Sequence, residues 1–486
     1  MATELFRSTS LLPLEADASA EDFLNAAKAA GDYLRTFATE GEQGIYWRQE
    51  SGQAPDQAPE AAPQIDFYTG NAGIIVFYLQ LAAVTGDTSY LEDALRGGEY
   101  IVSELRRTNY AYPITSGFAD FEPYRNNEST FYAGGFSGVA FALVELAKAT
   151  GNRDFDEVAY LLTEKVASLA QPAPAGVLWT GYSGTNHDAG TIHYLLYAAR
   201  HFDQPAWREL AAQAGRAIIA TGVREQSGGV RYQGFKNLLD YIVDDSGAEQ
   251  FFPGYAYGTA GMSFALARLY EETGEAAFLE AAREGAEYLI SIAQPVRAGK
   301  LIPYMQPENP EHIFYLGLCH GPVGSARLFY SLGYLADDER YRQFYLDLVR
   351  GIIGAGAPEY HSSGYWHTHC QCCGTAGFVN LFLGTWLKTG SEEFLDYATR
   401  SGKALLGDAT VLEGRAVWYQ AFSRIDPDLI SADLGYMNGA AGIGVALLQL
   451  HSALAGRFIT IRLPDDPFDA GAALPTWPTA VKQAGS

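Results

Sequence analysis

The chain has 486 residues, of which 48% are hydrophobic and 13% aromatic, a composition that supports a large packed core and argues against disorder. Its 57 acidic residues outnumber 33 basic ones, and the resulting net charge of −24 is spread along the chain. Such a surface favours solubility and argues against a nucleic-acid partner, whose backbone is bound by clustered lysine and arginine.

The sequence carries no sign of export or membrane insertion. The N-terminal segment MATELFRSTSLLPLEADASAED lacks a basic stretch followed by an apolar core, so we predict no signal peptide. No apolar run is long enough to span a membrane as a helix. Four cysteines are too few for a disulfide scaffold in so long a chain, and their clustering indicates metal or redox chemistry. We therefore expect a cytoplasmic protein.

One pattern recurs seven times: a short aromatic stretch, then Gly-x-x-Gly, then an apolar segment with helical spacing. In the third copy His187 takes the place of the first glycine. The copies lie about 50 to 70 residues apart, at the long end for repeat architectures. The second glycines are Gly73, Gly138, Gly190, Gly261, Gly324, Gly377 and Gly442. Because the segments that follow are apolar on nearly all sides, we expect seven buried helices.

A more polar helix follows most of these segments after a break such as Thr273-Gly274. Its apolar residues recur at steps of three and four, which predicts an amphipathic surface helix. Residues Ala20–Ala38 have the same pattern, so we expect them to pair with the last apolar helix, Gly442–Leu454, and to close a ring. The predicted fold is all-α: an α/α toroid with seven inner and seven outer helices. An open solenoid is the alternative, but it would need polar capping repeats at its ends.

Short stretches between outer and inner helices, such as GIYW at 44–47 and AVWY at 416–419, predict turns with brief β-like segments along one rim. Gln53–Pro63 is a Pro/Ala-rich loop, and the last residues, about 464–486, contain four prolines and predict an irregular tail. Neither segment requires a domain of its own, so we expect residues 1–486 to form a single domain.

In a closed ring the starts of all inner helices face one mouth, where unpaired N–H groups and helix dipoles favour anions. Cys319 and Cys372 occupy equivalent positions before the fifth and sixth Gly-x-x-Gly, and Cys373 follows directly. Three thiolates with an open fourth position are typical of a catalytic zinc site, although buried cysteines also serve as small apolar side chains. Cys370 does not fit the repeat; pairing with another cysteine, alternative ligation and no role stay open for it.

Seven apolar Gly-x-x-Gly helices, with Cys319-His320-Gly321 at the fifth and Cys372-Cys373-Gly374 at the sixth, resemble the lanthionine synthetase C-like (LanC-like) family of lanthipeptide cyclases from about Ala20 to His451. The resemblance implies an α/α toroid with Zn²⁺ at its mouth. It further implies that a cysteine thiolate of a dehydrated precursor peptide adds to dehydroalanine or dehydrobutyrine and closes a thioether ring. The implied zinc ligands are Cys319, Cys372 and Cys373, where Cys373 replaces the usual histidine as in a subset of fused synthetases.

Tyr257 stands where the family has a histidine for acid/base work. A tyrosine can donate a proton to an enolate but is a poor base near neutral pH. His320 follows an implied ligand and matches a position where the family places histidine or tyrosine near the reacting centre, which makes it a further catalytic candidate. His187, which would face the same cavity, and Asp188 beside it are candidates at the start of the third apolar helix. The structural alternatives are an orienting hydrogen bond for His320, helix capping for His187 and Asp188, and an aromatic wall for Tyr257.

Three functions follow, in this order. The first is a zinc-dependent cyclase that works alone or with a separate dehydratase or kinase/lyase. The second is a LanC-like protein that binds metal and peptide as a scaffold without cyclising them, which the replacement at Tyr257 motivates. The third is another α/α-toroid enzyme, such as a glycosidase or sugar epimerase. Rim aromatics suit sugars, but the helix starts supply no carboxylate pair and three cysteines would have no explanation.

Overall fold

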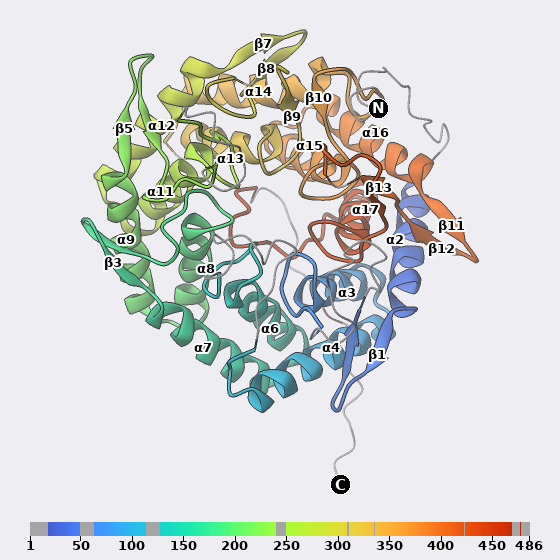
Figure 1. The fold of residues 1–486 in the computed structure, drawn as a ribbon. Helices are drawn as coiled ribbons and strands as arrows, with labels where there is room; N and C mark the ends of the chain where they lie inside the picture. The colour runs from blue at the N-terminus through green and yellow to red at the C-terminus, as the bar shows by residue number, and fades with distance from the viewer. Residues whose placement is uncertain are drawn as a thin grey trace.

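The computed structural model describes residues 18–48, 63–112, 127–239, 249–308, 311–334, 336–421, 423–468 and 477. Within this part of the chain, fourteen helices form two concentric rings around one axis (Figure 1). The inner helices are α3 (Asn71–Thr85), α6 (Phe136–Thr150), α8 (Asp188–His201), α11 (Thr259–Thr273), α13 (Pro322–Tyr334), α15 (Thr375–Thr389) and α17 (Ala440–Leu454). The outer helices are α2 (Ala20–Arg35), α4 (Thr88–Arg107), α7 (Arg153–Ser168), α9 (Pro205–Ala220), α12 (Ala276–Ile292), α14 (Glu339–Gly354) and α16 (Glu392–Asp408). The predicted α/α toroid is confirmed.

The inner helices are buried on nearly all sides because their sequences carry apolar residues around the whole circumference. Several end at the predicted Thr-Gly breaks. In α11, Thr273 Oγ1 donates to the carbonyl oxygen of Leu269, and Gly274 then adopts a left-handed conformation with φ of 72°. Glycine reaches this conformation without steric cost, so the chain can leave the inner ring and start the outer helix.

The outer helices bury one face only. In α12 the buried face includes Phe278, Ala282, Ala286 and Leu289, at the spacing that the sequence predicts. The ring closes through α2, which packs against α17: His451 Nδ1 lies 2.8 Å from the carbonyl oxygen of Ala20. This contact excludes the open solenoid. The α2 helix ends at Arg35, three residues before the predicted boundary, because strand β1 begins at Ala38.

The described residues form seven two-stranded sheets, whose strands all lie in connections that lead from an outer helix to the next inner helix. Six are antiparallel: β1 (Ala38–Glu40) with β2 (Ile45–Trp47), β3 (Gln171–Ala173) with β4 (Gly176–Leu178), β5 (Gly222–Arg224) with β6 (Val230–Tyr232), β7 (Gln294–Val296) with β8 (Gly299–Leu301), β11 (Thr410–Leu412) with β12 (Arg415–Val417), and β13 (Gln420–Ala421) with β14 (Ile430–Ser431). The seventh pair is parallel and joins β9 (Phe314–Tyr315) to β10 (Tyr365–Trp366). It therefore ties together the two segments that lead to the cysteines.

The predicted loop at Gln53–Pro63 lies outside the described residues except for its last residue, and so does most of the predicted tail, 469–476 and 478–486. The described part of the tail, up to Phe468, has no helix or strand and packs inside the ring. Among the described residues, none of the helices combines the length with the apolar character that a bilayer crossing requires.

Candidate metal centre

Backbone hydrogen bonds join the segments that precede neighbouring inner helices and form a belt across the mouth of the ring. The donor and acceptor pairs are Asn186 N to Ala256 O at 3.0 Å, Ala256 N to Cys319 O at 2.8 Å, Leu318 N to Cys372 O at 2.6 Å, Cys372 N to Met437 O at 2.9 Å and Met437 N to Tyr68 O at 3.0 Å. These are the positions that the repeat alignment makes equivalent or their direct neighbours. The belt therefore brings the fifth and sixth repeats side by side.

Close approach of the two cysteine-bearing segments depends on glycine. A Cβ at Gly317 would lie 2.5 Å from the Cα of Cys373, and a Cβ at Gly374 would collide with the carbonyl oxygen of Thr368. A larger residue at position 317 would push the two segments apart, because its obstacle is backbone of the other segment. A larger residue at position 374 would distort the turn that carries Cys372 and Cys373, because Thr368 belongs to that same segment. The local sequence thus sets the spacing of the sulfur atoms.

The three predicted ligands form one compact sulfur cluster. The Sγ atoms of Cys319, Cys372 and Cys373 all lie within 4.8 Å of one another, and the three side chains are buried. Cys372 is in disulfide contact with Cys319 and its Sγ lies 3.4 Å from that of Cys373. Thiolates on one tetrahedral zinc ion are about 3.8 Å apart, given Zn–S bonds of about 2.3 Å. The cluster in its reduced form therefore has the donor chemistry and the size of a zinc site.

Cys370 lies outside this cluster and is fully buried. Its Sγ accepts a hydrogen bond from the backbone N–H of Cys373 at 3.4 Å and lies 3.3 Å from Thr368 Oγ1. Both contacts orient the turn that presents Cys372 and Cys373. Cys370 is a free cysteine, and these contacts support a structural role in the turn, which was not among the three roles left open for it.

His320 follows Cys319 and sits in an aromatic box. Its ring centroid lies 4.7 Å from those of Phe252 and Tyr304, and 5.3 to 5.4 Å from those of Tyr257 and Tyr315. Burial lowers the pKa of His320 to about 3. The imidazole is therefore neutral near pH 7 and is held in place by its aromatic neighbours.

Tyr257, one of the four aromatic rings around His320, also contacts the ring of His187. The two residues belong to the fourth and the third repeat. The Tyr257 hydroxyl accepts a hydrogen bond from Asn186 Nδ2 at 2.7 Å, and the Tyr257 ring lies between His320 and His187. His187 is fully buried, and burial, with a smaller contribution from Lys236, lowers its pKa to about 3. The structure thus brings His320, Tyr257 and His187 together in one aromatic cluster.

Asp188 turns away from this cluster. Its carboxylate accepts hydrogen bonds from the backbone N–H groups of Trp179, Thr180 and Gly181 and from Thr180 Oγ1, at 2.8 to 3.1 Å. Burial raises the pKa of Asp188, and these hydrogen bonds oppose the rise. The carboxylate holds the loop after β4 against the start of α8. A catalytic role for Asp188 stays a prediction. The four hydrogen bonds leave its carboxylate little capacity to accept a proton or a further hydrogen bond.

Sequence reasoning missed a polar group on the rim beside His320. Tyr315 precedes Cys319 by four residues, and its hydroxyl accepts a hydrogen bond from Arg424 Nε at 3.2 Å. Arg424 also forms an ion pair with Glu311 at 2.8 Å. Tyr304 stacks on Tyr315, with centroids 4.2 Å apart. Aromatic residues before Cys-His-Gly were visible in the sequence, but Arg424 lies 109 positions further along.

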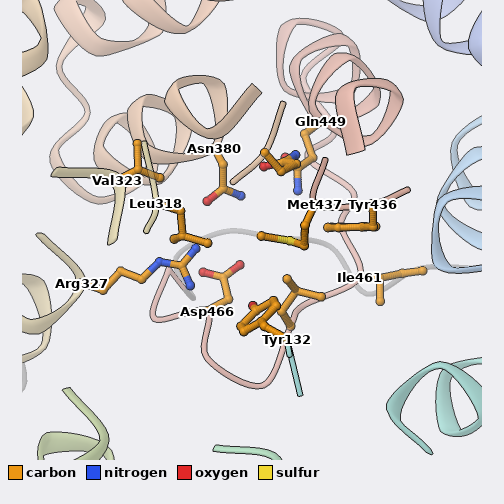
Figure 2. A pocket seen from close by; sticks show the side chains of 12 residues that line it. Tyr132, Leu318, Val323, Arg327, Asn380, Tyr436, Met437, Gln449, Ile461 and Asp466 are labelled. Carbon is orange, nitrogen blue, oxygen red and sulfur yellow. The ribbon is translucent and has the colours of Figure 1, made fainter. Parts of the chain in front are cut away.

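A small cavity lies on the axis of the ring, just inside the cysteine segments, with a volume of about 20 Å³. Its lining includes Leu318 and Gln371, the residues directly before two of the cysteines. Figure 2 shows the guanidinium of Arg327 and the carboxylate of Asp466 pointing toward one another there. The volume suits one or two water molecules, so the cavity is too small for a peptide.

The C-terminal segment anchors this axis through a buried ion pair. Arg327 Nη1 lies 3.1 Å from Asp465 Oδ2, and the two side chains are 6% and 2% exposed. The hydroxyls of Tyr132 and Tyr255 donate to the same carboxylate at 2.8 to 3.0 Å. Asp465 therefore joins residues from the second, fourth and fifth repeats behind the sulfur cluster.

Comparison with known proteins gave one family match. The sequence profile of lanthionine synthetase C-like proteins matches residues 63–458. No curated protein sequence matches the chain.

Solved structures with a similar course of the chain include three enzymes. Nisin cyclase matches 82% of this chain and 91% of its own, with 14% identity and a TM-score of 0.58. An α-1,6-mannanase from Salegentibacter sp. matches 89% and 99%, with 14% identity and a TM-score of 0.43. An unsaturated glucuronyl hydrolase specific for heparin matches 90% and 99%, with 11% identity and a TM-score of 0.47. At 14% sequence identity, the match to nisin cyclase shows a shared fold and no more. The other two structures are less similar to this chain, with TM-scores below 0.5.

Proposed function

This chain belongs to the lanthionine synthetase C-like family, and from that premise we propose that it is a zinc-dependent lanthionine cyclase. The observation that carries the proposal is the buried group of Cys319, Cys372 and Cys373 at the starts of adjacent inner helices. The substrate would be a dehydrated precursor peptide, supplied by a separate dehydratase or kinase/lyase. The product would be a peptide closed by thioether rings.

The donor set supports a resident Zn²⁺. A disulfide between Cys319 and Cys372 would engage two of the three sulfurs, whereas one ion bound by the reduced cysteines would engage all three. When bound, zinc supplies a Lewis acid that keeps the substrate thiol as thiolate near neutral pH. Reduced thiols persist in the cytoplasm, so we also propose a cytoplasmic location.

Residues of this chain would do the remaining work. The belt of backbone hydrogen bonds fixes the three cysteines, Gly317 allows the two segments that carry them to approach, and Gly374 allows the tight turn after Cys373. The aromatic cluster of His320, Tyr257 and His187 would form a surface that excludes most water and orients the peptide. Exclusion of water strengthens the electrostatic interactions of a reacting thiolate.

The test uses a set of synthetic peptides that each carry one dehydroalanine and one cysteine two to five residues apart. Purified protein should contain about one zinc per chain. It should consume the free thiol of such a peptide without a change in peptide mass, faster than buffer alone. Zinc-containing protein that binds these peptides but leaves the thiol free would instead support the scaffold function.

A further inference from the structure

The hydroxyl of Tyr315 has a cationic partner that favours proton release from it. Arg424 Nε donates to its oxygen at 3.2 Å, and the Tyr304 ring stacks on the Tyr315 ring at an angle of 18°. A cation that donates to a phenol oxygen stabilises the negative charge that develops when its proton leaves. The Tyr315 proton is thereby directed away from Arg424.

Tyr315 also lies close to the reacting centre that the cysteines define. It is in β9, four residues before Cys319, and its strand partner Trp366 lies in β10 ahead of the other two cysteines. The ring centroid of Tyr315 is 5.4 Å from that of His320. Burial raises the pKa of Tyr315 against the opposing charge and hydrogen bond of Arg424. Tyr315 is therefore protonated in the resting protein.

We propose that Tyr315 is the proton donor that completes thioether formation, with Arg424 and Tyr304 as positioning residues. This role rests on the proposed cyclase function. Tyr257, at the position of the family histidine, has its hydroxyl bonded by the neutral amide of Asn186, whereas Tyr315 has a guanidinium. The charged partner is the reason to prefer Tyr315.

The step balances as follows. The sulfur of the substrate thiolate forms a bond to Cβ of dehydroalanine, and the electron pair of the Cα–Cβ double bond moves toward the adjacent carbonyl to give an enolate. The Tyr315 O–H bond then breaks, and its proton passes to Cα. The phenolate left behind is stabilised by Arg424 and regains a proton from water. That proton balances the one released to solvent when the substrate thiol ionised.

The test compares Tyr315→Phe with Tyr365→Phe, which removes a hydroxyl from the paired strand, where the ring of Tyr365 stacks on Phe314. Cyclisation of the synthetic dehydroalanine–cysteine peptides is followed by thiol loss, and the configuration at the new Cα is determined after hydrolysis. We expect Tyr315→Phe to retain zinc, to cyclise roughly 10²-fold more slowly and to give a mixture of epimers. Tyr365→Phe should keep the wild-type rate and a single epimer.

Arg424 is tested by its own pair of variants. Arg424→Gln should slow cyclisation and give a mixture of epimers, as Tyr315→Phe does. Arg424→Lys should recover part of the rate and part of the stereochemical preference, because it returns a positive charge. If wild-type protein cyclises the peptides and Tyr315→Phe matches its rate and stereochemistry, the assignment of Tyr315 is overturned while the cyclase function stands. If wild-type protein cyclises none of them, the proposed function fails and the role of Tyr315 falls with it.

Discussion

Asp465→Ala removes the carboxylate that holds the C-terminal segment inside the ring. The variant removes the carboxylate that is ion-paired with the buried Arg327 guanidinium and leaves Asp466 as the nearby negative charge; it also takes an acceptor from the hydroxyls of Tyr132 and Tyr255. Loss of one partner of a buried ion pair costs about 3–5 kcal/mol. The carbonyl oxygen of residue 465 still accepts from Arg327 Nη1 at 3.0 Å, so we expect the lower end, about 3 kcal/mol.

Urea unfolding followed by far-UV circular dichroism measures this loss, with the exposed Asp428→Ala on the rim as the matched control. Asp428→Ala should change the free energy of unfolding by less than about 0.5 kcal/mol. The double variant Arg327→Met with Asp465→Leu should recover part of the stability, because it removes the buried Arg327 charge, although Asp466 then loses its nearby cation. The reasoning is refuted if Asp465→Ala unfolds at the same urea concentration as Asp428→Ala.

Three further predictions concern the sulfur cluster and its rim. Cys370→Ser should keep about one zinc per chain while Cys373→Ala loses it, because only Cys373 belongs to the cluster; equal zinc content by elemental analysis would contradict this. Gly317→Ala should lower the free energy of unfolding in urea by about 1–3 kcal/mol and weaken zinc retention, because the added Cβ meets the Cys373 backbone. Wild-type values for both would show that Gly317 does not set the spacing of the two segments. Burial raises the folded-state pKa of Asp408 to about 6, so ionisation of Asp408 weakens the fold as pH rises from about 4 to 6. Asp408→Asn should therefore match wild type at pH 4 and exceed it by about 2–3 kcal/mol above pH 6, and a difference independent of pH would exclude this cause.

The repeat made much of the fold predictable. Apolar periodicity is a local property of the sequence, so each inner and outer helix could be placed, and the amphipathic Ala20–Ala38 indicated where the ring closes. The cysteine cluster followed from the same alignment, because equivalent positions of neighbouring repeats must lie together in a ring.

Side-chain directions and contacts between distant segments were not predictable in this way. Asp188 could be named as a candidate from its place at a helix start, but not the direction of its carboxylate, which bends back to the loop at 179–181, where N–H groups outside any repeat equivalence bind it. Arg424 reaches Tyr315 across 109 positions and Arg327 reaches Asp465 across 138. Such pairs depend on how irregular segments cross the ring, which periodicity does not encode.

The same protein assayed with and without zinc gives the most direct test of the central claim. Protein loaded with one zinc per chain should consume one peptide thiol per thioether ring formed. Protein stripped by a chelator should lose this activity while circular dichroism shows that it remains folded. Added zinc should restore the activity of the wild-type protein but should give none to the Cys373→Ala variant. Equal cyclisation by the stripped, folded protein would contradict the account.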